Sequence, residues 1–304
     1  MKIIANGIHI EVEDSGAGLN QHGVERPVVL LIMGLGMQLI AWPPALVDAL
    51  VQAGFRVIRH DNRDIGLSQN FDALGNPNLV WAALKYRLGL PLKSPYRLHD
   101  MAADALGVLD ALKVLRAHVV GVSMGGMIAQ RLAIAAPSRV QSLTSIMSSS
   151  GARGLPEARP EVVRALIRRP GNAPHEVLVN YYVNFFRLIA SPAFPVAESE
   201  LRERIQFGIL RGSQPQGPSR QTLAIIADTK RAGELKNITS PTLVLHGKAD
   251  PLVPFACGED TARRIPGATL VGIEGMGHDL APGVVERLLP PMLDHINRSN
   301  PMAA

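Results

Sequence analysis

The chain has 304 residues, of which 47% are hydrophobic and only 19% are charged, so it can bury a large core and is not wholly disordered. The formal net charge is +5, but few residues are aromatic and no nucleic-acid-binding motif is present, which argues against a nucleic-acid partner. A single cysteine, Cys257, excludes an internal disulfide, a cysteine-rich zinc site and a CxxC redox pair.

The first 16 residues alternate apolar and polar side chains, which predicts a strand or a hairpin. They lack the apolar core of a signal peptide, and the apolar run at Val28–Met33 is far shorter than the roughly 18 residues that cross a bilayer. We therefore expect a cytoplasmic protein without a membrane partner. The sequence leaves homo-oligomer formation open.

Short β-rich runs then alternate with helical patterns along most of the chain. Strands are expected at Val28–Met33, Arg56–Asp61, His118–Val122, Val140–Met147, Thr242–His246 and Thr269–Ile273. Apolar residues at three- and four-residue spacing predict a helix over Leu98–Leu112, and a second helix is expected over Met124–Ala136, ended by Pro137. This alternation predicts an α/β protein with a doubly wound, mostly parallel sheet and helices on both faces.

The alternation stops after Ser150. Residues 151–235 show no buried-strand pattern but several short helical patches separated by prolines, so we expect an inserted helical cap on a core formed by residues 1–150 and 236–304. Aromatic side chains occur in this segment at four-residue spacing on one predicted helix. They are candidates to line a substrate pocket, or they form only the cap's own core: Tyr181, Tyr182, Phe185 and Phe186.

A GxSxG pattern, Gly121 to Gly125, lies between a predicted strand and a predicted helix. Side chains at positions 121 and 125 would collide where the backbone reverses, so the tight turn needs small residues there. Ser123 is thereby exposed at the carboxyl edge of the sheet, near the positive end of a helix dipole. Ser123 is the candidate nucleophile; the alternative is a structural turn with an incidental serine.

A serine nucleophile needs a base and a group that orients this base. Among nine histidines, His278 follows the last predicted strand in a glycine-flanked turn, which favours it as the base. Asp250 follows the strand at Thr242–His246 and lies between serine and histidine in chain order, as the orienting acid should. Asp61 and Asp64 precede the serine in a polar run, and we expect them to lock a loop by hydrogen bonds.

The oxyanion that forms during acyl transfer needs two preorganised donors. The backbone N–H of Met124, the residue after the nucleophile, is one expected donor. The other is expected from the loop Met33–Gly36, where we assign Leu35 N–H, with Gly36 as the fallback.

Patterns typical of cofactor and metal enzymes are missing from the sequence. After Gly34 and Gly36, Leu39 occupies the third glycine position of a dinucleotide-binding fingerprint. There is no Walker loop, no HExxH, no cysteine cluster and no SxxK. We therefore expect neither a cofactor nor a metal.

The chain resembles the α/β-hydrolases, and more narrowly the esterases related to aclacinomycin methylesterase. The resemblance lies in LIMGLGMQLIAWPPAL, RVIRHDNRDIGLS, DMAADALGVLDALKVLRAHVVGVSMGGMIAQ, PTLVLHGKADPLVP and GMGHDL, which cover most of residues 27–150 and 240–280. At Met33 the chain departs from the histidine that many α/β-hydrolases carry. The resemblance implies an α/β-hydrolase fold and assigns the catalytic triad to Ser123, Asp250 and His278 and the oxyanion donors to Leu35 and Met124.

The serine also separates this chain from dehalogenases and epoxide hydrolases of the same architecture, which use an aspartate nucleophile. The prediction is a serine esterase that cleaves small to medium-sized carboxylic esters through an acyl-enzyme. Lactone hydrolysis, carbon–carbon bond hydrolysis and cofactor-free perhydrolysis use the same residues and remain alternatives. A catalytically silent binding module is the remote alternative.

Overall fold

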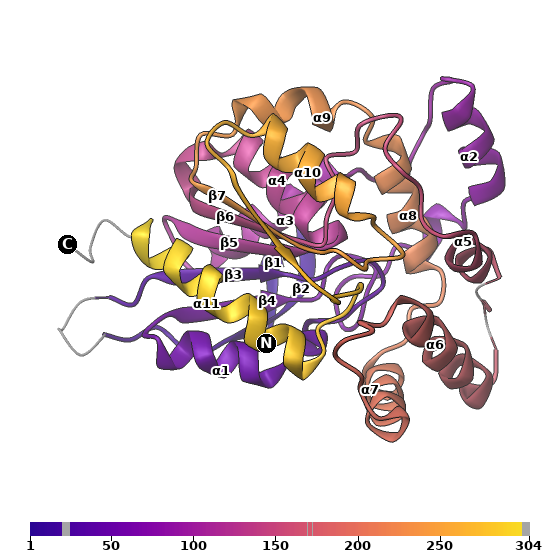
Figure 1. The fold of residues 1–304 in the computed structure, drawn as a ribbon, viewed down its shortest axis with the longest axis horizontal. Helices are drawn as coiled ribbons and strands as arrows, with labels where there is room; N and C mark the ends of the chain where they lie inside the picture. The colour runs from indigo at the N-terminus through magenta and orange to yellow at the C-terminus, as the bar shows by residue number, and fades with distance from the viewer. Residues whose placement is uncertain (20–24, 169, 172, 300–304) are drawn as a thin grey trace.

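The computed structural model describes residues 1–19, 25–168, 170–171 and 173–299 (Figure 1). In these residues, eight strands form one sheet in the order β1-β2-β4-β3-β5-β6-β7-β8. The strands are β1 (Lys2–Ala5), β2 (Ile8–Asp14), β3 (Val28–Ile32), β4 (Arg56–His60), β5 (Ala117–Val122), β6 (Val140–Ile146), β7 (Thr242–Gly247) and β8 (Thr269–Ile273).

The sheet is parallel from β4 to β8, whereas the hairpin formed by β1 and β2 is antiparallel and joins β4 at the edge. All six predicted strands are present, with ends that differ by at most one residue, as strand ends commonly do. The N-terminal hairpin and the doubly wound, mostly parallel sheet are therefore confirmed.

Two helical layers bury the sheet from both sides (Figure 1). Helices α1 (Pro44–Gln52) and α11 (Pro282–Arg298) cover one face, and α3 (Leu98–Ala111) and α4 (Met124–Ala135) cover the other. Helix α10 (Phe255–Arg264) packs beside β7 and β8.

Burial on both faces explains why the sequence of strand β3 is apolar throughout. Leu30 and Ile32 point into the layer of α3 and α4, whereas Val29 and Leu31 point into the layer of α1 and α11. Because successive side chains of a strand point to opposite faces, a strand covered on both sides must be apolar at every position.

The remaining helices lie in two long connections. The described residues between β6 and β7 form helices and no strand, in agreement with the pattern of residues 151–235: α5 (Pro160–Ile167), α6 (His175–Ile189), α7 (Glu198–Arg211), α8 (Gly217–Ala227) and α9 (Arg231–Glu234). Helix α2 (Leu79–Arg87) follows β4, was not predicted, and projects from the body (Figure 1). Short 3₁₀ turns lie at Leu39–Ala41, Asp72–Leu74, Pro137–Arg139 and Leu235–Asn237.

None of the helices in the described residues combines the length and apolar composition that a membrane span requires.

Candidate active site

Ser123 lies at the turn between β5 and α4 with a backbone conformation that L-residues rarely adopt, φ 55° and ψ −119°. Two glycines make this turn sterically feasible. A Cβ at Gly121 would lie 2.2 Å from the carbonyl oxygen of Gly125, and a Cβ at Gly125 would lie 2.0 Å from that of Ile32. The spacing of the GxSxG pattern therefore follows from two backbone contacts that leave no room for a side chain.

His278 follows β8, and its ring lies between two predicted partners. Its Nε2 is 3.0 Å from Oγ of Ser123, and its Nδ1 is 2.7 Å from Oδ2 of Asp250. The second carboxylate oxygen of Asp250 accepts the backbone N–H groups of Leu252 and Val253, both at 2.8 Å. The structure thus brings Ser123, His278 and Asp250 into one continuous chain of hydrogen bonds.

A second histidine lies near the same carboxylate. His246 Nε2 is 3.7 Å from Asp250 Oδ2 but only 2.7 Å from the carbonyl oxygen of Val253. Burial lowers the pKa of His246, so its ring is neutral at pH 7 and adds no charge beside Asp250. Asp250 therefore has one close imidazole partner, His278.

The loop after β3 passes directly beside the nucleophile. A Cβ at Gly34 would lie 3.3 Å from the Cβ of Ser123. In this loop Gly36 N–H donates to Oε1 of Gln221 at 2.9 Å. The fallback oxyanion donor is therefore already hydrogen-bonded. Within the part of the chain that the structure describes, no protein acceptor takes the N–H of Leu35 or of Met124. The N–H of Leu35 is therefore favoured over that of Gly36 as the second oxyanion donor.

The same loop is held at three points by polar side chains. Asn62 donates to the carbonyl oxygen of Met33, Gln221 of α8 accepts from Gly36, and Asp61 accepts from Leu39 N–H at 2.7 Å. Donors fixed in this way need little reorganisation when charge develops on the substrate.

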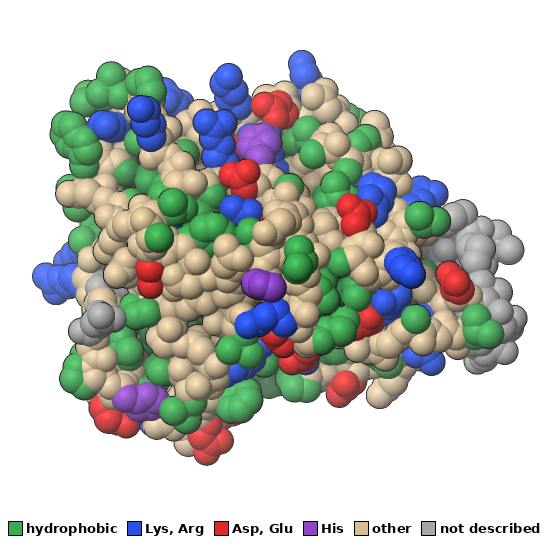
Figure 2. All heavy atoms as spheres, turned by 180° about the vertical axis from the view of Figure 1, so that it is seen from behind, with side chains coloured by type: hydrophobic (Ala, Val, Ile, Leu, Met, Phe, Trp, Pro, Cys, Tyr) green, Lys and Arg blue, Asp and Glu red, His purple; other side chains and the backbone are tan. Residues whose placement is uncertain are grey.

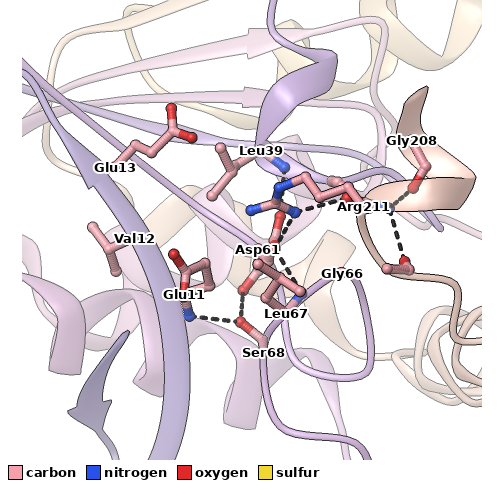
Figure 3. A network of polar contacts seen from close by, with 12 residues as sticks. Glu11, Val12, Glu13, Leu39, Asp61, Gly66, Leu67, Ser68, Gly208 and Arg211 are labelled. Atoms are coloured by element: carbon pink, nitrogen blue, oxygen red, sulfur yellow. Dashed lines mark hydrogen bonds and ion pairs between the residues drawn. The ribbon is translucent and has the colours of Figure 1, made fainter. Parts of the chain in front are cut away.

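Asp61 is the centre of the network drawn in Figure 3. Its side chain accepts from the N–H groups of Leu39 and Leu67 and from the guanidinium of Arg211, which also donates to Gln38. Burial raises the pKa of Asp61, and these donors oppose that effect. The network joins the loops after β3 and β4 to the end of α7, as we expected of a loop-locking cluster.

Asp64, in the loop after β4, has a similar environment and is paired with an arginine of α8. Its two carboxylate oxygens accept Nε and an Nη of the buried Arg220 at 2.7 and 2.8 Å, and one of them also accepts Phe71 N–H. The predicted loop-locking role of Asp64 is therefore confirmed as well.

The loop that carries His278 is held by the last residue of α6 and by a serine that follows the helix. His278 N–H donates to the carbonyl oxygen of Ile189 at 2.7 Å, and Gly277 N–H donates to Oγ of Ser191 at 2.8 Å. Ser191 in turn gives its N–H and its hydroxyl to the two carboxylate oxygens of Asp279, at 2.8 and 2.6 Å. Sequence reasoning missed this contact, because its partners are 88 residues apart.

We expect Ser191→Ala to lower kcat by about tenfold, because an unpaired buried donor costs about 1–3 kcal/mol and lets the histidine loop shift. KM for a small ester should change little, and Ser191→Thr should restore part of kcat. Ser142 is a matched control: it is also buried and hydrogen-bonded, to His118 at 2.8 Å. Ser142→Ala should lower thermal stability without lowering kcat. Wild-type kcat in folded Ser191→Ala would refute the positioning role.

The four aromatic side chains of α6 divide into two pairs. Tyr182 and Phe186 pack against an apolar cluster formed by Val179, Val183 and Ile205 between α6 and α7. Tyr181 stacks on Phe185, with ring centroids 6.2 Å apart, and its hydroxyl donates to the carbonyl oxygen of Ala165. Tyr182 and Phe186 thus contribute to the core of the helical segment, whereas Phe185 lies outside that cluster.

The described residues contain no group of three His, Cys, Asp or Glu side chains that could hold a metal ion.

Comparison with known proteins matches residues 27–281 to a family model described as the alpha/beta hydrolase fold. The chain is 30% identical over 286 residues to the rhodomycin D methylesterase DnrP of Streptomyces peucetius, covering 88% of this chain and 90% of the relative. It is 28% identical over 282 residues to a putative carbamate hydrolase, RutD, of Pantoea ananatis, covering 92% of each.

A solved structure, a meta-cleavage product hydrolase from Pseudomonas fluorescens, superposes with a TM-score of 0.74 at 22% identity, covering 99% of this chain and 98% of the other. At this identity the likeness shows the architecture alone.

Proposed function

Because this chain belongs to the α/β-hydrolase fold family, we propose that it hydrolyses carboxylic esters with Ser123 as nucleophile, His278 as base and Asp250 as orienting acid. The observation that carries the proposal is the continuous chain of hydrogen bonds from Asp250 through His278 to Ser123. The methylesterase relative supports an ester as the substrate class.

The proposed reaction has two steps. His278 Nε2 takes the proton as Ser123 Oγ attacks the ester carbonyl, and the N–H groups of Leu35 and Met124 stabilise the oxyanion. The imidazolium then gives this proton to the departing alcohol. In the second step water gives a proton to the same imidazole and attacks the acyl-enzyme; the acid is released as the imidazolium returns this proton to Ser123 Oγ, which restores both residues. Asp250 keeps the proton of His278 on Nδ1 throughout.

We also propose that residues 151–235 act as a cap over this site. Three groups from the segment support the idea, since Gln221 contacts the oxyanion loop, Arg211 contacts Asp61, and Ser191 contacts the histidine loop. A segment with these contacts borders the nucleophile and can limit the size of the acyl or alcohol group. The substrates we propose are small to medium-sized esters.

The aromatic pairs of α6 allow a matched test of specificity. Phe185→Ala should raise the preference for bulkier esters over small ones, because each methylene accommodated or excluded changes discrimination by about 1–3 kcal/mol. Phe186→Ala should reduce stability and affect all esters by one common factor, since Phe186 packs in the core of the segment. The measurement is kcat/KM across a series of ester sizes for both variants. If both variants change kcat/KM by one common factor for every ester size, the pocket lies elsewhere.

The experiment that tests the function itself uses purified protein with short p-nitrophenyl esters. Turnover should be lost after treatment with a serine-directed phosphonate, and mass spectrometry should find the adduct on Ser123. The alternatives use the same residues, so a parallel panel of substrates separates them. The panel contains lactones, substrates of carbon–carbon bond hydrolases, and an assay for peracid formation from hydrogen peroxide. Labelling of Ser123 without turnover of any substrate class would contradict the proposal.

The cytoplasmic location and the lack of a nucleic-acid partner stay predictions.

A further inference from the structure

Helix α2 exposes a continuous apolar face. Val80 is 69% exposed, Leu84 44% and Leu88 63%, and these three residues succeed one another at four-residue spacing on one side of the helix. Trp81, 53% exposed, lies beside them, and Leu90, 48% exposed, follows the helix end. An exposed indole within such a cluster is unusual on a protein surface that faces only water.

The opposite side of α2 fixes the helix to the body. Ala82 is 5% exposed, and α2 packs on α8. Asn78 caps the helix by accepting Trp81 N–H at 2.9 Å. The apolar face is therefore presented outward by an ordered element rather than by a loose segment.

Cations border this apolar face, and carboxylates are scarce around it. Lys85 Nζ lies 5.5 Å from the ring centroid of Trp81. Residues 73–99 contain Lys85, Arg87, Lys93 and Arg97 but no aspartate or glutamate. Glu157 lies 3.6 Å from Arg87, and both side chains are highly exposed. Figure 2 shows apolar and basic side chains together at the upper left corner, where α2 projects.

We propose that α2 is an interfacial anchor that binds the surface of a bilayer with anionic lipid headgroups. Leucine, valine and tryptophan on one face insert among the upper acyl chains, as in helices that lie in the plane of a membrane. The flanking Lys85 and Arg87 extend their ammonium and guanidinium groups to lipid phosphates. This proposal departs from the expectation of no membrane partner, which rested on the absence of a spanning segment.

Charge is what favours lipid over a second copy of this chain. A two-fold contact through the apolar face of α2 would bring Lys85 and Arg87 close to their own copies. The carboxylate of Glu157 is already paired with Arg87. Like charges brought together across an interface oppose association, whereas phosphate headgroups neutralise them.

The two tryptophans supply a direct readout. Trp42 is fully buried and Trp81 is exposed, so any blue shift of emission on adding vesicles reports Trp81. We expect a blue shift and co-sedimentation with phosphatidylglycerol vesicles, and little of either with pure phosphatidylcholine vesicles. Lys85→Gln should weaken the partition coefficient by about fivefold, and high salt should weaken it further.

Leu84→Gln/Leu88→Gln keeps the Trp81 reporter and removes two leucines from the apolar face. This double variant should lose binding at least tenfold, while its turnover of a soluble ester stays at the wild-type value, which shows that the protein is folded. Leu210→Gln is the matched control, since Leu210 is 76% exposed on α7, away from α2 in sequence, and should leave vesicle binding unchanged.

Three outcomes would overturn the proposal. The first is no blue shift or sedimentation with anionic vesicles. The second is equal binding by the double variant and the wild type. The third is a dimer without lipid that the double variant abolishes, because the face would then be an interface between copies.

Discussion

Replacing Ser123 by alanine should lower kcat for ester hydrolysis by about 10³-fold or more. The variant loses the atom that attacks the carbonyl, and the oxyanion donors alone can accelerate only the direct attack of water. Alanine has the same Cβ as serine, so the strained backbone at φ 55° faces no new steric conflict. The thermal midpoint should therefore remain near that of the wild type.

The measurement is kcat under saturating ester, together with circular dichroism to verify the fold. A useful control is Ser148→Ala, because Ser148 Oγ donates to the carbonyl oxygen of Ser123 at 2.7 Å and has no proposed chemical role. Its effect on kcat should be far smaller than that of Ser123→Ala. Near-wild-type hydrolysis by folded Ser123→Ala would remove Ser123 from the mechanism.

Asp250→Asn should lower kcat by about 10⁴-fold, the magnitude seen for the equivalent change in a serine protease. The asparagine Oδ1 can still accept from Leu252 and Val253. Its NH₂ group then faces Nδ1 of His278, which must become an acceptor. The proton of His278 moves to Nε2, and this nitrogen can no longer take the proton of Ser123.

The matched control for this substitution is Asp14→Asn. Asp14 is also a hydrogen-bonded carboxylate, paired with Arg56 at 2.7 and 3.0 Å, but it lies on β2, in the antiparallel part of the sheet. This variant should lose stability and keep its kcat. If Asp250→Asn and Asp14→Asn reduce kcat equally, the orienting role of Asp250 is wrong.

Local sequence was sufficient for the framework of this protein. The uninterrupted apolar run of β3 predicts a strand buried on both faces, and the glycines around Ser123 predict a sharp turn after β5. These patterns depend on steric and burial requirements of a few neighbouring residues, so they can be identified without knowledge of the rest of the chain. The order of serine, aspartate and histidine, each after a different parallel strand, then predicts that the three side chains meet at one edge.

Other features depend on how distant segments pack, and only the tertiary structure decided them. Gln221 accepts the N–H of Gly36, although the two residues are 185 positions apart in the sequence. This contact favours Leu35 as the oxyanion donor. Ser191 reaches Asp279 across 88 residues. No local pattern encodes such pairs, because a buried polar group is satisfied by whichever partner the fold brings near.

The helices of the chain show the same division. The four-residue spacing in α6 predicts which aromatic side chains share a face, but not that Tyr182 and Phe186 face α7 while Tyr181 faces the chain at Ala165. In α2 the sequence supplies leucines, valine and tryptophan, which a core would equally accept. Their exposure follows from the side of the helix that packs on α8, and that choice is made by the tertiary contacts because burial is a property of the whole fold.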